Sequence, residues 1–364
     1  MAYITRIGTA VPQYRFSQTT LADFMVHAMG LNPSDARRLR TVFRASGIQW
    51  RHSVLSDYGK TENFSFYPNG VGPFPSTEQR LNVYRQHALQ LSLSAIRSCI
   101  GQHQTNPAGI THLIVVSCTG MYAPGLDIDL VNALPLNPDV ERLCINFMGC
   151  YAAFTALKAA SAFCAARPDA RVLVVCTELC SLHFQPDNTD DNVLANALFA
   201  DGAAAVLVSN QPEPGLNFKL QQFYNTLAIN GTDHMTWNVG NTGFAMRLSG
   251  YVPELIRSGI GPLTRRLLEP LGHQLTDIAY FAIHPGGRRI LQAVEEQLRI
   301  RTEDNFAAYT VLKEFGNMSS PTVLFVLQRL AQSLTRSDDG NTVLSFAFGP
   351  GLTLESMLLK VEHA

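Results

Sequence analysis

The amino-acid sequence predicts a layered α/β fold made of two successive halves. Three short apolar runs have the length and continuous hydrophobicity of buried strands, at residues 112–117, 171–176 and 203–208. Residues 151–166 lie between the first two runs. This segment is rich in alanine and apolar nearly all round, a pattern that predicts a helix buried in the core. The same alternation returns after residue 216. Continuous apolar strands between helices favour mostly parallel sheets covered on both faces.

The remaining elements follow in chain order. Residues 15–50 are helical and basic, residues 56–78 have the glycine and proline content of a loop, and residues 79–101 return to helical spacing. A proline-containing segment at 210–216 predicts the internal boundary. We therefore expect an N-terminal half of residues 1–212 and a C-terminal half of residues 213–364. The second half is predicted to contain helices at 253–271, 288–298 and 319–335, and strands at 278–283, 342–348 and 352–360.

Composition excludes several classes of protein. Only 16% of the 364 residues are charged and 46% are hydrophobic, so much of the chain is buried within the fold or against a partner subunit. A net charge of −1 leaves no basic field for binding nucleic acid. No apolar run approaches the length of a membrane span, and the N-terminus lacks the pattern of a signal peptide. We therefore expect a cytoplasmic protein without a membrane span.

The cysteines favour neither disulfides nor a metal site. Seven cysteines is an odd number in a long chain, which argues against a disulfide framework. The sequence contains no Cys-x-x-Cys pair, so we expect no zinc site. Most of these thiols are expected to be small buried hydrophobic groups, with one free to be reactive.

Cys150 is the candidate for that reactive thiol. It follows Gly149 directly before the apolar helix, where the positive end of the helix dipole favours the thiolate. Gly149 permits a sharp turn of the backbone and leaves space for a substrate beside the sulfur. A buried structural cysteine explains the same position equally well.

Three further motifs offer partners for a thiolate. His284 stands where an apolar strand ends in Pro-Gly-Gly, and functional groups of α/β folds collect at such ends. Asn317 follows a glycine at the start of a helical run, and Ala347–Leu352 places two glycines around a proline between two strands. Each has an ordinary structural explanation: a hydrogen-bonded turn histidine, a helix N-cap and a hairpin turn. Together they supply a base and an amide for a nucleophilic cysteine.

The same cysteine, histidine and asparagine have two other interpretations: a papain-like protease, and a structural or binding protein. Papain-like proteases also use Cys, His and Asn, and the gap of 284 − 150 = 134 residues is similar to theirs. That class is disfavoured because the nucleophile lies mid-chain, the Cys-Gly-x-Cys-Trp motif is absent and no disulfide framework is evident. A purely structural or binding role is the alternative outside enzymes.

The chain resembles type III polyketide synthases, the chalcone-synthase-like branch of the thiolase fold, nearly from end to end. The matching motifs are Ser117-Cys118-Thr119-Gly120, Met148-Gly149-Cys150, Leu198-Phe199-Ala200-Asp201-Gly202-Ala203, His284-Pro285-Gly286-Gly287, Gly316-Asn317-Met318-Ser319 and Phe348-Gly349-Pro350-Gly351. The resemblance implies a homodimer of internally duplicated, five-layered αβαβα subunits. It implies no metal and no cofactor, with coenzyme A thioesters as substrates.

The resemblance also implies the catalytic roles. Cys150, His284 and Asn317 correspond to the catalytic triad, with Cys150 and His284 paired as thiolate and imidazolium. The sulfur accepts an acyl group from a starter acyl-CoA. His284 and Asn317 then stabilise the enolate formed when malonyl-CoA loses CO2, and this enolate attacks the acyl-enzyme.

Further residues are assigned by position. Phe199 corresponds to the aromatic gatekeeper between the coenzyme A tunnel and the cavity. The complete set of candidate substrate-binding residues is Phe199, Cys118, Cys180, His183, Trp237, Met246, Gly286, Gly287, Ser319, Gly349, Pro350 and Gly351. Plant enzymes bind the coenzyme A phosphates with Lys and Arg in an early helix, whereas Gln49 here is uncharged at such a position. Nearby arginines are possible substitutes, and the candidates for coenzyme A binding are Arg44, Arg51 and Arg289.

The N-terminal stretch and the segment Cys180–Pro186 look most like bacterial alkylpyrone synthases. This favours a fatty acyl-CoA starter, a few malonyl extensions, and an α-pyrone or resorcinol product. Trp237 fits an apolar wall but could equally shorten the cavity. Two alternatives therefore stay open: a malonyl-only phloroglucinol- or tetrahydroxynaphthalene-type synthase, and a single-condensation ketoacyl synthase.

Overall fold

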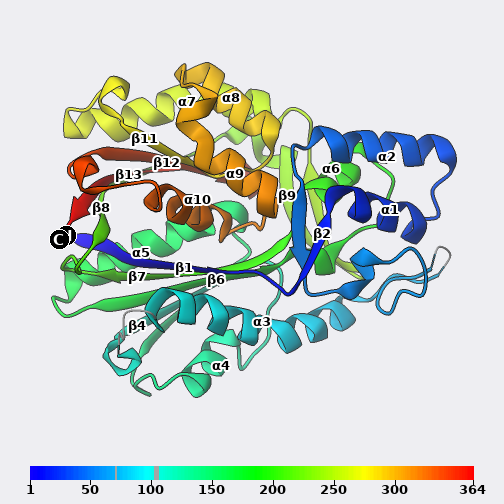
Figure 1. Cartoon of the computed structure of the whole chain (residues 1–364), viewed down its shortest axis with the longest axis horizontal. Coiled ribbons are helices and arrows are strands. Elements are labelled where there is room, and N and C mark those ends of the chain that lie inside the picture. The colour runs from blue at the N-terminus through cyan, green and yellow to red at the C-terminus, as the bar shows by residue number, and fades with distance from the viewer. Residues whose placement is uncertain (70–71, 102–105) are drawn as a thin grey trace.

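The computed structural model describes residues 1–69, 72–101 and 106–364, which form five stacked layers (Figure 1). The outer layers hold α3 (Thr77–Ile100) and α4 (Leu126–Ala133) on one side and α7 (Val252–Leu268) and α8 (Arg288–Leu298) on the other. The middle layer holds α5 (Ala152–Ala166) and α10 (Thr322–Ala331), with α9 (Phe306–Phe315) beside it. Strands fill the two layers between. The prediction of a five-layered α/β fold is confirmed.

The strands of both layers belong to one continuous nine-stranded sheet, because β1 of the first half pairs with β8 of the second. Its order is β11 (Tyr280–Ile283), β12 (Thr342–Gly349), β13 (Thr353–His363), β8 (Leu216–Leu227), β1 (Ala2–Ala10), β7 (Asp201–Ser209), β6 (Arg171–Leu179), β4 (His112–Ser117) and β5 (Glu141–Asn146). In the N-terminal half β4 runs parallel to β6, whereas β6–β7 and β7–β1 are antiparallel. The series β11, β12, β13, β8 repeats these orientations in the C-terminal half. The repeated order confirms the internal duplication.

The predicted strand direction is wrong. Among the described residues, five of the eight pairings in this sheet are antiparallel and three are parallel. The strands are covered by helices on both faces, so they are continuously apolar in either direction. Direction depends on the connections instead, such as the short turn Pro350–Leu352 that returns β12 into β13.

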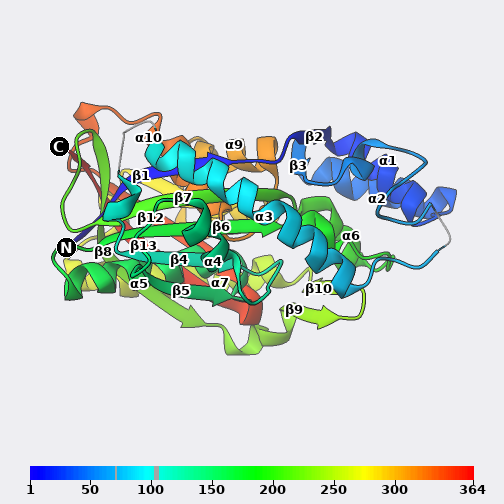
Figure 2. The same ribbon diagram turned by 90° about the horizontal axis from the view of Figure 1, so that it is seen from below.

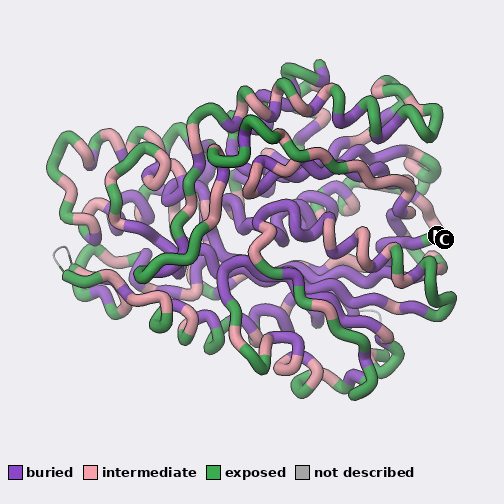
Figure 3. Tube along the Cα trace, turned by 180° about the vertical axis from the view of Figure 1, so that it is seen from behind, coloured by how far each residue is buried: buried purple, intermediate pink, exposed green. Residues whose placement is uncertain are grey.

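Helix α3 covers one face of the N-terminal strands, and Figure 2 shows it lying across them. Buried residues concentrate in the strands and in the middle helices, whereas exposed residues follow the outer helices (Figure 3). The segment Gly149–Ala166 has the length and apolar composition of a membrane-spanning helix. It packs against β1, β4, β6 and β7, so its composition is that of a core helix.

Smaller elements cap one end of the strands, opposite the two termini (Figure 1). These are β2 (Tyr14–Ser17), α1 (Gln18–Ala28), α2 (Pro33–Ala45), β3 (Trp50–Ser53), α6 (Asp190–Leu198), β9 (Met235–Gly240) and β10 (Gly243–Leu248). The predicted helical segment 15–50 thus contains α1 and α2 between two paired strands. Residues 70 and 71 of the predicted loop 56–78 lie outside the described residues.

Candidate active site

A tight turn presents Cys150 at the start of α5. Phe147 and Gly149 have φ values of 59° and 73°, in the left-handed region that glycine favours. A Cβ added to Gly149 would lie 2.4 Å from Cδ of Pro350, and a Cβ on Gly349 would lie 3.4 Å from the Cys150 nitrogen. The Gly-Pro-Gly loop therefore packs directly on the turn that carries the candidate nucleophile. Both glycines are required by this close approach.

Asn317 contacts the sulfur from the opposite half of the chain. Its Oδ1 and Nδ2 each lie 3.9 Å from Cys150 Sγ, and both residues are buried. The backbone of Asn317 is fixed because its N–H donates to Leu198 O and its carbonyl accepts from Ala200 N, both at 2.9 Å. Its Oδ1 accepts from Ser319 N at 2.8 Å, which leaves Nδ2 facing the site as a donor. Asn317 is therefore not the N-cap that the sequence pattern suggested, since Pro321 holds that position at the start of α10.

His284 is completely buried at the end of β11. Its backbone N–H donates to Phe346 O at 2.8 Å, whereas neither ring nitrogen has a hydrogen-bond partner in the described part of the chain. Gly286 joins it to the amide, because Gly286 N donates to His284 O and Gly286 O accepts from Asn317 Nδ2 at 3.3 Å. A buried imidazole with both nitrogens free is costly unless another molecule uses it. This arrangement suits a group that bonds to substrate.

Burial decides the protonation of the two groups taken singly. It raises the pKa of the Cys150 thiol to about 11, although hydrogen bonds with Ser319 and Asn317 act the other way. Burial also lowers the pKa of the His284 imidazole to about 3. Each group alone is therefore neutral at pH 7. A thiolate–imidazolium pair forms only if the attraction between the two charges and the start of α5 exceeds both desolvation costs.

A buried carboxylate behind the sulfur was not anticipated from the sequence. Cys118 Sγ lies 3.3 Å from Ser319 Oγ and 3.3 Å from an oxygen of Glu178, which has no exposed surface. Glu178 also accepts hydrogen bonds from Ser320 Oγ at 2.6 Å and Thr119 Oγ1 at 2.7 Å. Burial nevertheless raises the pKa of Glu178. The one signal in the sequence was a single charge near the end of an otherwise apolar strand.

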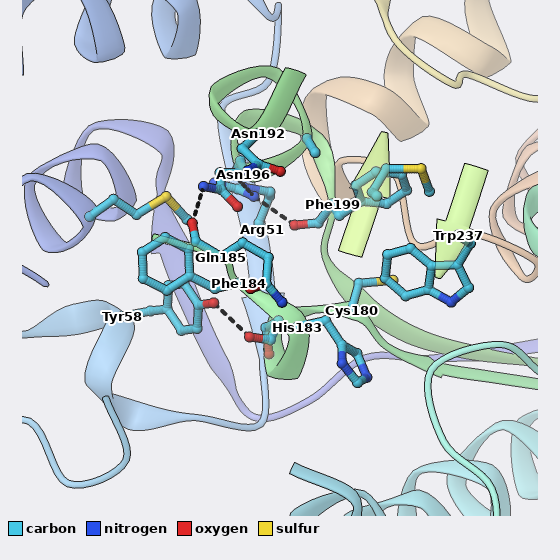
Figure 4. Close-up of a pocket in the computed structure, with 14 residues that line it drawn as sticks. Arg51, Tyr58, Cys180, His183, Phe184, Gln185, Asn192, Asn196, Phe199 and Trp237 are labelled. Carbon is cyan, nitrogen blue, oxygen red and sulfur yellow. Dashed lines mark hydrogen bonds between the residues drawn. The ribbon is translucent and has the colours of Figure 1, made fainter. Parts of the chain in front are cut away.

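Five candidate substrate-binding residues line one small cavity. Its volume is about 40 Å³, and those five are Cys180, His183, Phe199, Trp237 and Met246. Figure 4 shows four of these five, labelled, among the side chains around it. Cys118 and Ser319 lie near Cys150 instead, as described above.

The aromatic wall of this cavity is held rigidly. The His183 ring stacks on Phe244 with centroids 4.2 Å apart, and its Nδ1 accepts from Phe244 N at 3.0 Å. Its Nε2 then donates to Thr119 O at 2.6 Å, since burial lowers the pKa of His183 to about 3 and keeps it neutral. The indole N–H of Trp237 donates to Cys118 O at 2.7 Å.

The structure separates the three arginines proposed for coenzyme A. Arg289 lines a cavity of about 410 Å³ together with Gly286 and Gly287. Arg44 lines a different cavity of about 420 Å³. Arg51 is only 3% exposed, lines the same cavity as Phe199 and donates to two backbone carbonyls, and its assignment as a coenzyme A ligand stays a prediction. Among the described residues no group of three or more His, Cys, Asp or Glu could hold a metal ion.

Comparisons with known proteins identify the family. Residues 1–212 match the N-terminal domain and residues 216–362 the C-terminal domain of chalcone and stilbene synthases. The chain is 32% identical to the alpha-pyrone synthesis polyketide synthase-like Pks18 of Mycobacterium tuberculosis, over 99% of this chain and 91% of that protein. It is 29% identical to a putative chalcone synthase of Bacillus subtilis, over 100% of this chain and 99% of that one.

Solved structures give the same result. The C-terminal type III polyketide synthase domain of Steely1 from Dictyostelium matches with a TM-score of 0.90 and 30% identity, over 99% of both chains. PKS-I from the brown alga Ectocarpus siliculosus matches with a TM-score of 0.89 and 29% identity, over 99% of this chain and 98% of that one. The chain therefore belongs to the chalcone and stilbene synthase family and is a type III polyketide synthase, an enzyme of the acyltransferase class.

Proposed function

We propose that Cys150 is the nucleophile that accepts the starter acyl group, with His284 and Asn317 as its catalytic partners. The observation that carries this proposal is the Asn317 amide 3.9 Å from the sulfur, which Gly286 links to His284, a buried imidazole without a partner in the described chain. The sulfur attacks the thioester carbonyl of an acyl-CoA, and coenzyme A leaves as its thiol. The acyl group is then held as a thioester on Cys150.

Extension uses the same two partners in another way. His284 and Asn317 donate hydrogen bonds to the thioester oxygen of malonyl-CoA while its C–C bond to the carboxylate breaks. The electron pair left by CO2 forms an enolate, whose negative oxygen these donors stabilise. The enolate carbon attacks the acyl-enzyme carbonyl and the Cys150 sulfur leaves. Decarboxylation supplies the carbanion, so no base has to remove a proton from carbon.

For substrate and product, we propose a fatty acyl-CoA starter, a few malonyl extensions and ring closure to an alkylpyrone or alkylresorcinol-type product. The 32% identity to an alpha-pyrone synthesis protein supports this choice, as do the apolar walls formed by Cys180 and Met246. A malonyl-only synthase is the second candidate. The rigid Trp237 and a cavity of about 40 Å³ favour its smaller products.

Product analysis separates these candidates. The enzyme is incubated with radiolabelled malonyl-CoA alone and with acyl-CoA starters of increasing chain length. We expect labelled pyrones or resorcinols that contain the added fatty acyl chain. Equal product without a starter would favour the malonyl-only synthase, and a β-ketoacyl product of one extension would favour the single-condensation synthase. A lack of label in every product would refute polyketide synthesis by this chain.

Trp237 offers a direct test of what limits product size. Trp237→Ala removes the indole from the cavity wall, so we expect longer starters or additional extensions to be accepted. Trp237→Phe is the matched control, because it keeps most of the ring volume while it removes the N–H bond to Cys118 O. Unchanged products in Trp237→Ala would show that the limit lies elsewhere.

We also propose that the enzyme is a homodimer that acts in the cytoplasm. The edge strand β5 pairs only with β4 in the described chain, and most of its residues are exposed. Light scattering is expected to give twice the chain mass of 40.0 kDa, and a monomer would contradict the proposal. Cell fractionation tests the location.

A further inference from the structure

We propose that Arg51 is a positioning residue, whose buried guanidinium holds the end of α6 so that Phe199 and Asn317 keep their places in the active site. This rests on the proposed function of Asn317 and adds a residue that acts only through others. Arg51 lies on β3, which is distant in the chain from both of the segments it contacts.

The first contacts are to the carbonyls that end α6. Arg51 Nη1 donates to Asn196 O at 2.8 Å and to Phe199 O at 2.6 Å. Its Nε donates to Gln18 Oε1 at 2.9 Å, and Gln18 Nε2 donates in turn to Ala197 O at 2.7 Å. The last carbonyls of a helix have no partner within it and carry partial negative charge. A fixed cation and an amide satisfy them here.

The second contacts link this helix end to the catalytic amide. Leu198 O accepts from Asn317 N, so each carbonyl from 196 to 199 has a donor. Gly316, with φ of +71°, lies against the stem of Arg51: a Cβ there would be 2.9 Å from Arg51 Cγ. One side chain thus touches the segment before Asn317 and the carbonyl of Phe199.

The charge itself argues for this role. Arg51 is 3% exposed, and no carboxylate lies within salt-bridge distance of it in the part of the chain described. A buried cation without a direct ion pair is costly, and the more distant Asp201 does not offset the cost of its burial. An apolar side chain would fill the space without that cost. Burial lowers the pKa of Arg51 to about 10, so it stays charged at neutral pH. What an apolar residue cannot supply is the set of donors that bonds two backbone carbonyls directly and a third through Gln18.

The test separates two partial reactions in the full-length enzyme. Acyl loading is measured by intact mass after brief exposure to acyl-CoA, and malonyl-CoA decarboxylation by release of labelled CO2. For Arg51→Met we expect decarboxylation to fall about 10²-fold, because a displacement of about 1 Å in a catalytic group can cost that much. The rate of acyl loading should stay near that of the wild type, since neither Cys150 nor His284 belongs to the segments that Arg51 contacts. Arg51→Lys keeps the positive charge but cannot bond all the same acceptors. Its decarboxylation rate should lie between those of the wild type and Arg51→Met.

Asn217→Ala provides the control for a loss of stability. Asn217 is fully buried at the far end of the molecule, where its side chain bonds to Glu213 and Gly215. Its loss should lower the melting temperature without changing the ratio of decarboxylation to loading. If Arg51→Met changes both reactions equally, or changes neither, Arg51 is not a positioning residue.

Two further outcomes are decisive. If Arg51→Met does not fold, Gln18→Leu replaces it: this variant removes the bonds to Ala197 O and to Arg51 Nε and should lower the same ratio, less strongly. An unchanged ratio there overturns the proposal. If the wild-type enzyme neither loads an acyl group nor releases CO2, the proposed function fails. If the wild-type enzyme performs both reactions and the variants leave the ratio of decarboxylation to loading unchanged, only the proposed role of Arg51 is refuted.

Discussion

At the scale of single residues, the site combines two ionisable groups that burial keeps neutral when each is considered alone. Cys150 and His284 each have a pKa shifted by burial against the charged form. Both lie beside Asn317 or Gly286, which themselves share a hydrogen bond of 3.3 Å. The pair can therefore be reactive at neutral pH only through mutual stabilisation, and removing one partner should expose the effect of burial on the other.

The pH dependence of alkylation tests this coupling. In the wild type, imidazolium should hold the thiolate, so iodoacetamide should react with Cys150 at pH 7 and below. In His284→Ala the burial remains, opposed by hydrogen bonds with Ser319 and Asn317, and the thiol pKa should lie near 11. Since the thiolate fraction falls about tenfold per pH unit below the pKa, alkylation at pH 7 should be slow and rise with pH.

The control for this experiment is Cys150→Ala. It reports the alkylation of the six other cysteines, of which only Cys144 is exposed. A profile that is the same in wild type and His284→Ala would show that His284 does not influence the thiol.

The local sequence pattern singled out Cys150, His284 and Asn317, and their catalytic roles stay a prediction. Cys150 precedes a core helix and His284 ends a strand, positions that are visible in the sequence pattern. Asn317 lies in the connection between α9 and α10, and its distance of 3.9 Å from the sulfur is known only from the structure. The burial of Arg51 could not be predicted, because a basic segment has the same composition whether its side chains face solvent or backbone carbonyls. The contacts of Glu178 could not be predicted either, because the groups that donate hydrogen bonds to it come from two segments far apart in the chain.

At the scale of elements, the turn at Gly149 and the Gly-Pro-Gly loop form a single contact surface. The loop connects β12 to β13, so the sequence-based hairpin interpretation was correct as far as it went. Its second role, packing on the turn before α5, depends on distances between halves of the chain that periodicity does not report. The parallel-strand prediction failed for a related reason, since hydrophobicity records burial and not direction.

Gly349→Ala tests that contact surface. The added Cβ would lie 2.5 Å from Cδ1 of Tyr151, so the loop or the Cys150 turn must shift. Overpacking of this kind typically costs about 1–3 kcal/mol, and we expect a lower melting temperature together with slower acyl loading. Gly109→Ala is the matched control, because the nearest contact of its Cβ among the described residues would be Arg171 Nη1 at 3.9 Å. Normal loading in Gly349→Ala would contradict the proposed contact.

At the scale of the whole molecule, the two predicted halves share the larger of two hydrophobic cores in the described chain, and the second core belongs to the N-terminal half alone. A single cluster of buried residues joins α5 of the first half to α10 and the strands of the second. The sheet is also continuous, through pairing of Ala2–Ile4 on β1 with Phe218–Leu220 on β8. The two structural repeats therefore bury their apolar surface against each other.

Calorimetry of the intact chain tests this shared core. We expect one unfolding transition, in which the calorimetric enthalpy equals the van't Hoff enthalpy, because the core that contains α5 and α10 is lost when either half unfolds. Residues 1–212 alone should be strongly destabilised, since the side of α5 that faces the second half would be exposed to water. Two separate transitions would show that the halves are independent domains.

The most direct test of the central claim compares two variants in the two partial reactions. Cys150→Ala should abolish acyl loading, measured by intact mass, yet retain some release of CO2 from malonyl-CoA, because His284 and Asn317 remain. His284→Ala should lose both reactions. Product formation by Cys150→Ala at the wild-type rate would contradict the assignment of the nucleophile.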